Sequence, residues 1–188
     1  MPVFSTSWIA CAVALLMTPS TPSPSAYRMS VTVTAATAEE MRQWARKVAS
    51  RCEGGDVIVL TGDLGAGKTT FTQGLASGLG ITDRVTSPTF VISRVHPHPG
   101  DGLGLVHVDA YRLGTVAELD DLDLYTDLDA SVTVVEWGRG LAERLSPHGL
   151  TIVITRSDVD DDDERTLTLS ARDDRWASIL ADHGWWAT

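Results

Sequence analysis

Asparagine is absent from this chain of 188 residues, and cysteine occurs only twice, at Cys11 and Cys52. Without asparagine there is no N-K-x-D sequence to recognise guanine, and residues 155–158, T-R-S-D, resemble that motif only weakly. The missing motif disfavours a GTPase-like switch. Two cysteines without a C-x-x-C pair argue against a disulfide scaffold or a cysteine zinc site, and they favour a reducing cytoplasm.

Basic residues are scarce, with 15 Lys and Arg against 25 Asp and Glu and a net charge of −10. Such an acidic chain is a poor independent binder of nucleic acid, because phosphate contacts need a basic footprint. Any RNA in its biology is therefore expected to be held by another subunit. With 43% hydrophobic residues, the chain can bury one core but is too short for two ordinary domains.

A long hydrophobic run is also missing. Residues 4–17 are mostly apolar, but the run is too short to span a bilayer, and it lacks the preceding Lys or Arg of a secretory signal. Residues 18–25 are rich in proline and serine. We expect residues 1–28 to be a disordered N-terminal extension, such as a translation-start artefact would produce, with a cleaved signal as the alternative. Residues 29–188 are expected to form a single cytoplasmic domain that does not enter a membrane.

Residues 62–69 read G-D-L-G-A-G-K-T and match the phosphate-loop pattern G-x-x-x-x-G-K-[S/T] at every defined position. An apolar run typical of a buried strand, residues 57–60, precedes the motif. A helix with Phe71, Leu75 and Leu79 spaced by four is expected after it. Loop and helix together would direct several backbone N–H groups at a polyphosphate. The alternative, a glycine-rich turn that merely resembles the motif, is disfavoured by the two flanking elements.

The motif predicts which residues bind nucleotide and metal. Lys68 would reach the β- and γ-phosphates of ATP or ADP and act as a catalytic cation, and the Thr69 hydroxyl would be a ligand of Mg²⁺. The residues expected to bind the nucleotide are Asp63, Gly65, Ala66, Gly67, Lys68, Thr69 and Thr70.

The rest of the chain alternates strand and helix patterns, which predicts an α/β fold. We expect a P-loop NTPase-like three-layer sandwich with a mostly parallel central sheet. Thr37, followed three residues later by Glu40, predicts the start of a helix through a capping box. Residues 85–95 are expected to be extended and broken by Pro88, and residues 96–104 to form a loop. Further strands are expected at 31–33, 105–108, 132–135, 150–155 and 166–170, and further helices at 117–128 and 176–180.

Asp109 and Glu136 each follow directly after an apolar strand pattern, L-V-H-V and V-T-V-V respectively. Ligands of open α/β sheets bind at the carboxyl ends of the strands, where both side chains would lie. Phosphate-loop enzymes use one carboxylate there to hold Mg²⁺ and often a second to orient the attacking water. Spacing alone leaves open which of the two contacts the metal, and an ordinary strand-end carboxylate is the alternative for each.

Four motifs, in this order, resemble those of the TsaE family, also called YjeE. They are G-D-L-G-A-G-K-T-T at 62–70, T-S-P-T-F at 86–90, H-V-D-A-Y-R at 107–112 and E-W-G at 136–138. The resemblance covers roughly residues 34–155 and implies a P-loop ATPase of bacterial tRNA threonylcarbamoyladenosine synthesis. It also implies TsaB and TsaD as partners: TsaD-type enzymes modify the adenosine next to the anticodon, and TsaE-type ATPases support their repeated turnover. The tRNA would be contacted only indirectly, through the complex.

The resemblance also implies roles for individual residues. Thr69 and Glu136 match the family's Mg²⁺ ligands, and Asp109 matches its catalytic acidic residue near the γ-phosphate. Trp137 matches a tryptophan beside the nucleotide. Residues 87–90 match a loop that behaves like a GTPase switch.

Two departures from the family pattern affect these expectations. The sequence has E-W-G where E-W-P is common, so Gly138 is expected to loosen the turn after Glu136. Met41 and Ala45 stand where many relatives carry Thr and Gly, which leaves the contacts to adenine from the first helix open.

ATP hydrolysis is expected to be slow for the isolated chain and stimulated by partner subunits. No arginine is identifiable as a built-in finger, and Arg112 is a candidate only through its nearness to Asp109. A small-metabolite kinase is an alternative, disfavoured because residues 113–128 contain no Arg or Lys for a lid. The other alternative to an ATPase is a nucleotide-gated switch or interaction module with negligible hydrolysis.

Three remaining features receive plainer interpretations. His96 and His98 are expected to be exposed in their proline-glycine loop rather than to bind a metal. The acidic residues 158–164 are expected to form a solvated turn, because they lack the ligand spacing of a calcium loop. Trp185 and its neighbour are unusual in a free tail and are expected to pack on the core or on a partner.

Overall fold

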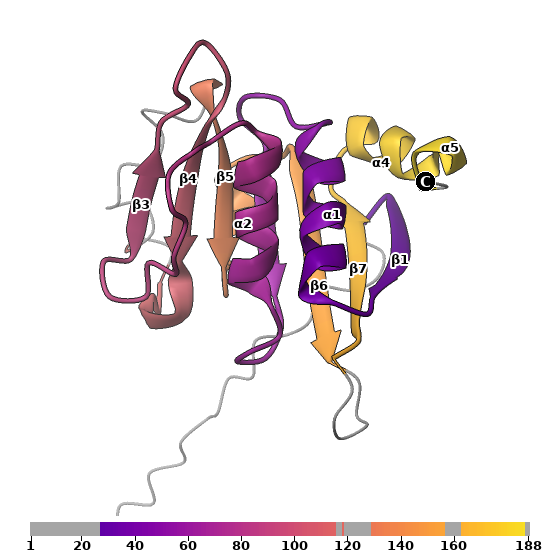
Figure 1. Ribbon diagram of the computed structural model, residues 1–188, viewed down its shortest axis with the longest axis horizontal. Coiled ribbons are helices and arrows are strands. Elements are labelled where there is room, and N and C mark those ends of the chain that lie inside the picture. The colour runs from indigo at the N-terminus through magenta and orange to yellow at the C-terminus, as the bar shows by residue number, and fades with distance from the viewer. Residues whose placement is uncertain (1–26, 116–117, 119–128, 157–162, 187–188) are drawn as a thin grey trace, which may run out of the picture.

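The computed structural model describes residues 27–115, 118, 129–156 and 163–186. Strands and helices alternate along these residues, as expected of an α/β fold (Figure 1). In chain order the elements are β1 (Met29–Ala35), α1 (Ala38–Ala49), β2 (Val57–Thr61), α2 (Lys68–Gly78), β3 (Ser93–His96), β4 (Gly104–Asp109), η2 (Ala110–Arg112), β5 (Ser131–Glu136), η4 (Ala142–Arg144), β6 (Gly149–Arg156), β7 (Arg165–Ala171), α4 (Asp174–Ala181) and α5 (His183–Trp186).

The strands form one seven-stranded sheet in the order β1-β7-β6-β2-β5-β4-β3. The consecutive strands β6, β2, β5 and β4 are parallel, whereas β1–β7, β7–β6 and β4–β3 are antiparallel pairs. The expectation of a mostly parallel sheet therefore holds only for the centre, and the sheet as a whole is mixed. Connection length explains two of the three antiparallel pairs, β3–β4 and β6–β7. Residues 97–103 and 157–164 are too short for the crossover that parallel neighbours need.

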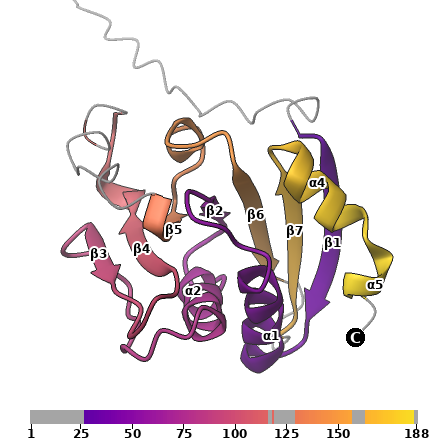
Figure 2. The same ribbon diagram turned by 90° about the horizontal axis from the view of Figure 1, so that it is seen from above.

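Helices α1 and α2 lie side by side across one face of the sheet (Figures 1 and 2). The opposite face is lined by valines of the central strands, which pack against Ala142 and Leu145 in and after η4. The helix expected at residues 117–128 lies outside the described residues, apart from Glu118. Of the three expected layers, the described part of the chain contains the sheet, one helical layer and short turns on the other side.

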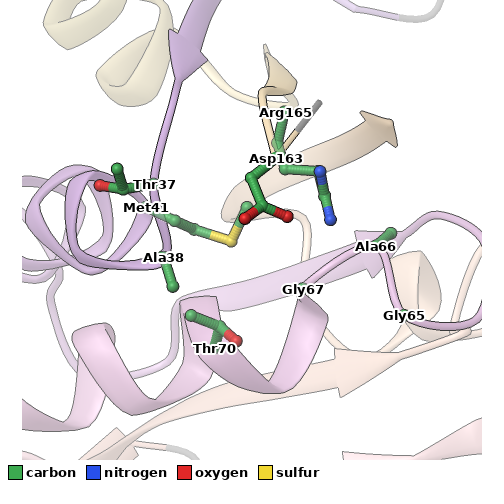
Figure 3. A pocket seen from close by; sticks show the side chains of 9 residues that line it. All are labelled: Thr37, Ala38, Met41, Gly65, Ala66, Gly67, Thr70, Asp163 and Arg165. Carbon is green, nitrogen blue, oxygen red and sulfur yellow. The ribbon is translucent and has the colours of Figure 1, made fainter. Parts of the chain in front are cut away.

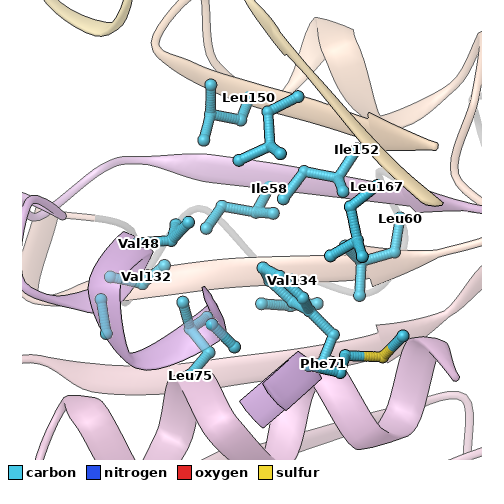
Figure 4. Close-up of a cluster of buried hydrophobic side chains, with 14 of the residues drawn as sticks. Val48, Ile58, Leu60, Phe71, Leu75, Val132, Val134, Leu150, Ile152 and Leu167 are labelled. Carbon is cyan, nitrogen blue, oxygen red and sulfur yellow. The ribbon is translucent and has the colours of Figure 1, made fainter. Parts of the chain in front are cut away.

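Strand β2 lies in the middle of the sheet order, and both of its faces are buried. Ile58 and Leu60 belong to the cluster on the helical face together with Phe71 of α2 (Figure 4). Val57 and Val59 belong to the cluster on the opposite face. These four residues of β2 each have an exposed fraction of 0%. The loop that follows this strand therefore starts from a fixed point.

Two glycines on α2 allow the helices to approach each other closely. A Cβ atom on Gly74 would lie 2.6 Å from the Arg42 backbone, and one on Gly78 would lie 2.6 Å from the Cβ of Ala49. Any larger side chain on α2 at these two positions would push the helices apart. The contact therefore determines how α2, which begins at the end of the glycine-rich motif, lies on the sheet.

Helices α1 and α4 begin at side-chain caps. Thr37 Oγ1 accepts a hydrogen bond from the N–H of Glu40 at 3.1 Å, which confirms the expected start of α1. The carboxylate of Asp173 likewise accepts from the N–H of Trp176 at 2.9 Å, and Trp176 is fully buried. Trp185 of α5 belongs to the same core cluster, in agreement with the expectation that it packs on the core.

Residues 85–95 differ from the extended segment expected there, because only Ser93–His96 is a strand. The carbonyl oxygen of Pro88 accepts from the N–H groups of Val91 at 2.9 Å and Ile92 at 2.7 Å, which makes a turn. Ile92 has a left-handed φ of 69°, so the chain cannot be extended at this point. The expectation that His96 is exposed was also wrong: it pairs with Leu105 in the sheet and is buried.

Residues 1–26 of the expected N-terminal extension, and 158–162 of the acidic segment, lie outside the described residues. Arg28 is already attached to the domain. Its backbone N–H donates to the carbonyl of Ala171 at 3.1 Å, and its guanidinium pairs with Asp174 at 2.7 Å. None of the helices in the described ranges has the length and apolar character needed to cross a membrane.

A buried carboxylate connects α4 to the start of β2. Asp56 precedes β2 directly and is 1% exposed. It accepts hydrogen bonds from Arg175 Nη2 at 2.5 Å, from Trp176 Nε1 at 3.1 Å and from the backbone N–H of Glu53 at 2.9 Å. Asp56 thus provides the acceptors for three donors that belong to two distant parts of the chain.

Asp56→Ala should lower the free energy of unfolding by about 2–3 kcal/mol, because it leaves buried donors without acceptors. The matched control is Asp174→Ala, which removes a carboxylate from an exposed ion pair and should cost less than about 1 kcal/mol. Urea unfolding of both variants measures the difference. Equal costs would contradict the structural role of Asp56.

Candidate functional site

The glycine-rich motif, Asp109 and Glu136 meet in one cleft, as the sequence predicts. The cleft has a volume of about 410 Å³ and lies at the carboxyl ends of β2, β4 and β5. Its lining residues are Leu64, Gly65, Gly67, Lys68, Thr69, Thr70, Ser87, Thr89, Asp109, Glu136 and Trp137. We call it the main cleft.

The glycine loop, residues 62–67, needs glycine at particular positions. Gly65 and Gly67 have left-handed φ values of 77° and 109°. A Cβ atom on Gly62 would lie 2.3 Å from the carbonyl oxygen of Ile154, and one on Gly67 would lie 2.8 Å from the sulfur of Met41. The Ile154 backbone and the Met41 side chain therefore pack closely against the loop. This close packing holds its backbone N–H groups at the start of α2.

Lys68 is the first residue of α2 and is 5% exposed. Its ammonium group donates to the carbonyl oxygens of Gly62 at 2.8 Å and Asp63 at 2.9 Å, and it lies 3.8 Å from the ring centroid of Trp137. Burial lowers the pKa of Lys68, while the negative charge of Glu136 is the largest opposing influence. The site thus holds a poorly hydrated cation at the floor of the cleft.

Glu136 connects three elements of the site. It ends β5, is 3% exposed, and its Oε1 accepts hydrogen bonds from Thr69 Oγ1 and His107 Nε2, each at 2.9 Å. The structure therefore brings together Thr69 and Glu136, which the family resemblance implies as metal ligands. A hydroxyl and a carboxylate are hard oxygen donors of the kind that Mg²⁺ prefers, so this donor pair fits the ion.

Asp109 holds the loop at residues 87–90 instead of standing free in the cleft. Its Oδ2 accepts from Thr89 Oγ1 at 2.5 Å and lies 3.4 Å from Ser87 Oγ, while its Oδ1 accepts from the N–H of Tyr111 at 3.0 Å. The two hydroxyls are also 2.7 Å apart. The sequence predicts both the carboxylate and the loop, but not the direct bond between them.

The turn after Glu136 is tight. Trp137 has a left-handed φ of 61°, and its ring makes an edge contact with Tyr111 at a centroid distance of 5.4 Å. A Cβ atom on Gly138 would lie 2.5 Å from Val135 Cγ1 and 2.8 Å from Ala142 Cβ. Glycine is therefore needed at position 138 for close packing, a role that the expectation of a looser turn did not include.

A smaller pocket of about 150 Å³ adjoins the glycine loop on the side of α1. Figure 3 shows the thioether of Met41 extending from α1 into the space between Asp163 and Thr70. The lining residues are Thr37, Ala38, Met41, Gly65, Ala66, Gly67, Thr70, Asp163 and Arg165. Asp163 and Arg165 could not be predicted from the sequence, because only the pairing of β6 with β7 brings them beside the glycine loop.

A second arginine lies near this pocket. Arg156 ends β6 and pairs directly with Arg165 of β7. Its Nη1 lies 4.0 Å from the position that a Cβ atom on Gly65 would take. Arg112, in contrast, stacks on the exposed ring of Phe90 at 5.5 Å. No group of three or more His, Cys, Asp or Glu side chains suitable for a metal was found among the described residues.

A glycine loop between a central strand and a helix, with lysine, threonine and two carboxylates at one edge of an α/β sheet, is the arrangement typical of phosphate-loop proteins. The family model described as threonylcarbamoyl adenosine biosynthesis protein TsaE matches residues 35–167. The chain belongs to the TsaE family.

Individual relatives agree with this assignment. A Streptomyces coelicolor protein named tRNA threonylcarbamoyladenosine biosynthesis protein TsaE is 52% identical over 147 residues, covering 75% of this chain and 99% of that protein. Its Bacillus subtilis namesake is 45% identical over 142 residues, covering 75% and 85%. The crystal structure of Bacillus subtilis YdiB superimposes with a TM-score of 0.63 at 36% identity, covering 81% of this chain and 92% of that one.

Thr89→Val should release the loop at residues 87–92, because it removes the hydroxyl that donates to Asp109. One such bond is worth about 1 kcal/mol, so amide exchange at Val91 and Ile92 should accelerate about fivefold. Thr86→Val is the matched control, since Thr86 is exposed and makes no hydrogen bond with the described residues. Hydrogen exchange measured by NMR tests this. Unchanged rates in Thr89→Val would show that the bond does not hold the loop.

Proposed function

We propose that this chain is an ATP hydrolase that supports the synthesis of threonylcarbamoyladenosine in tRNA together with TsaB and TsaD. One observation carries the proposal. Lys68, Thr69, Asp109 and Glu136 come from three separate stretches of sequence and line one cleft beside the glycine loop, in a chain of the TsaE family. A small-metabolite kinase would share the cleft, but the family of this chain and the names of its relatives concern tRNA modification.

The main cleft would take the β- and γ-phosphates. N–H groups of the glycine loop and the first turn of α2 would donate to phosphate oxygens, where the helix N-terminus favours negative charge. Lys68 would exchange its bonds to the carbonyls of Gly62 and Asp63 for bonds to phosphate. Because its ammonium is poorly hydrated, this exchange costs little desolvation.

Mg²⁺ would be held by Thr69 and Glu136, and when bound it supplies positive charge to the phosphate oxygens. The Thr69 hydroxyl can offer a lone pair to the ion while it still donates its hydrogen to Glu136. Glu136 would hold the ion directly or through a water. Two protein ligands are enough for such a site, because Mg²⁺ usually keeps several water ligands and also binds phosphate oxygens of the substrate.

Asp109 would orient the attacking water. It lies on β4, directly beside Glu136 in the sheet register, so the two carboxylates are adjacent at the mouth of the cleft. Glu136 would hold Mg²⁺ on one side of the γ-phosphate, and Asp109 would orient the attacking water on the other. Asp109 accepts hydrogen bonds from Thr89 and Tyr111, and its Oδ2 would accept from a water in place of Thr89.

The smaller pocket would take the ribose and base, because it shares Gly65, Gly67 and Thr70 with the main cleft. Its apolar wall is Met41, at a position where the sequence leaves adenine contacts open (Figure 3). Arg156 and Arg165 face each other across β6 and β7, so two positive charges lie close together near the glycine loop. Both arginines support the binding of a negatively charged nucleotide.

Partner subunits would be needed for rapid turnover. No arginine of the described chain lines the main cleft, and Arg112 is stacked on Phe90. An arginine finger is worth roughly a thousandfold or more in phosphoryl transfer, so the isolated chain should hydrolyse ATP slowly. Leu64 and Phe90 are 87% exposed at the rim of the site, which supports a partner surface there. The net charge of −10 agrees with tRNA being held by the partner.

ATP and ADP should bind in a Mg²⁺-dependent manner, and ATP should bind at least about tenfold more tightly than GTP, a difference of about 1.4 kcal/mol. The reason is the complete phosphate-binding motif combined with the absence of a guanine-reading asparagine. Calorimetry with each nucleotide, in Mg²⁺ and in EDTA, measures both effects. Equal or tighter binding of GTP would refute the ATPase assignment.

Lys68→Ala should abolish ATP hydrolysis and the multiple-turnover tRNA modification by a mixture with TsaB and TsaD. It removes the cation that faces the β- and γ-phosphates. Lys47→Ala is a matched control, because Lys47 is on α1 and contacts Trp44 outside the cleft. Adding TsaB and TsaD should raise the ATP turnover of the wild type and of Lys47→Ala. Normal modification with Lys68→Ala would mean that ATP hydrolysis is not its cellular role.

A further inference from the structure

His107 is a fully buried polar side chain without an assigned role in the site. It lies on β4 two residues before Asp109 and is 0% exposed. Its Nε2 is 2.9 Å from Glu136 Oε1, and Glu136 is 3% exposed. Solvent therefore cannot replace this contact on either side. A buried contact to a candidate metal ligand influences where the carboxylate lies.

The hydrogen on His107 is located by its surroundings. Nδ1 is buried and has no hydrogen-bond partner among the described residues, whereas Nε2 faces a carboxylate oxygen. An unpaired buried N–H costs more than an unpaired lone pair, so the hydrogen belongs on Nε2, where it is donated to Glu136. His107 thus acts toward Glu136 as a hydrogen-bond donor in a fixed direction.

The two hydrogen bonds of Glu136 both end on the same oxygen. Thr69 Oγ1 and His107 Nε2 donate to Oε1, and within the described chain Oε2 accepts no hydrogen bond. Glu136 also lines the main cleft. With Oε1 held from two sides, Oε2 is the oxygen left for a ligand in the cleft. Only His107 holds it from within the sheet, since Thr69 itself faces the cleft.

We propose that His107 is a positioning residue for metal binding: its Nε2–H fixes the carboxylate of Glu136 so that the other oxygen is presented to Mg²⁺. The inference rests on the proposed function, because it concerns the metal that would accompany the nucleotide. Outer partners of metal-ligating carboxylates commonly change metal affinity 10- to 100-fold when they are removed. His107 would act through Glu136 and need not touch the nucleotide.

The test compares two variants with the same amide group and different reach. In His107→Gln the amide nitrogen can take the place of Nε2 and donate to Glu136, whereas the shorter side chain of His107→Asn ends before it. His107→Leu removes the donor altogether. The measurement is the Mg²⁺ concentration for half-maximal binding of a fluorescent ADP analogue, with binding in EDTA as a second measurement and circular dichroism to verify folding.

We expect the Asn and Leu variants to need about 10-fold or more Mg²⁺ than the wild type, and the Gln variant to stay within a few-fold of it. Binding in EDTA should change little in all three. His96→Leu is the matched control, because His96 is also a buried histidine of this sheet but does not contact Glu136. It should titrate like the wild type.

The outcomes separate the two proposals. If the wild type shows no Mg²⁺-dependent nucleotide binding, the proposed function fails and the role of His107 fails with it. If the wild type titrates with Mg²⁺ and His107→Asn and His107→Leu do so equally well, only the role of His107 is overturned. An equal loss in EDTA, or the same loss in His96→Leu, would also overturn it, because the effect would then be general destabilisation.

Discussion

The parallel register of the three central strands is the constraint on which the site depends. Leu60 of β2 pairs with Glu136, and Glu136 pairs in turn with Asp109. Neighbouring strands are about 4.8 Å apart, so the glycine loop and the two carboxylates follow one another along a single edge of the sheet. The glycine loop and the two carboxylates thus leave the sheet at nearly the same level. Strand pairing in the core brings these parts of the site together.

A second constraint comes from the helical layer. The glycine-mediated contact between α1 and α2 determines where α2 begins, and therefore where Lys68 and Thr69 lie relative to Glu136. Met41 fills the space beside Gly67 in the same layer. A change in packing between the helices would thus reach the phosphate-binding motif without altering any of its residues. The core and the site share one set of contacts.

Much of this arrangement could be predicted from the sequence. The glycine loop, the capped helix at Thr37, and the carboxylates at the ends of β4 and β5 all follow from local patterns of a few residues. What could not be predicted depends on contacts between distant residues. His96 was expected to lie in a loop because prolines follow it, and nothing in these neighbours indicates that β3 pairs with β4. The role of Gly138 depends on Ala142 and Val135 lying against it. The mixed sheet depends on which strands pair at the edges.

The bond between Thr89 and Asp109 has a consequence for the order of events in a catalytic cycle. Oδ2 of Asp109 accepts the hydroxyls of Thr89 at 2.5 Å and Ser87 at 3.4 Å, which together occupy both of its lone pairs. If Asp109 is the residue that orients the water, the loop at residues 87–90 must withdraw before bond cleavage can start. Cleavage then follows a conformational step, and the rate at which the loop withdraws sets the time between nucleotide binding and cleavage. Such a delay would give the chain the behaviour of a timer, whose interval a second protein could shorten or lengthen by touching Phe90.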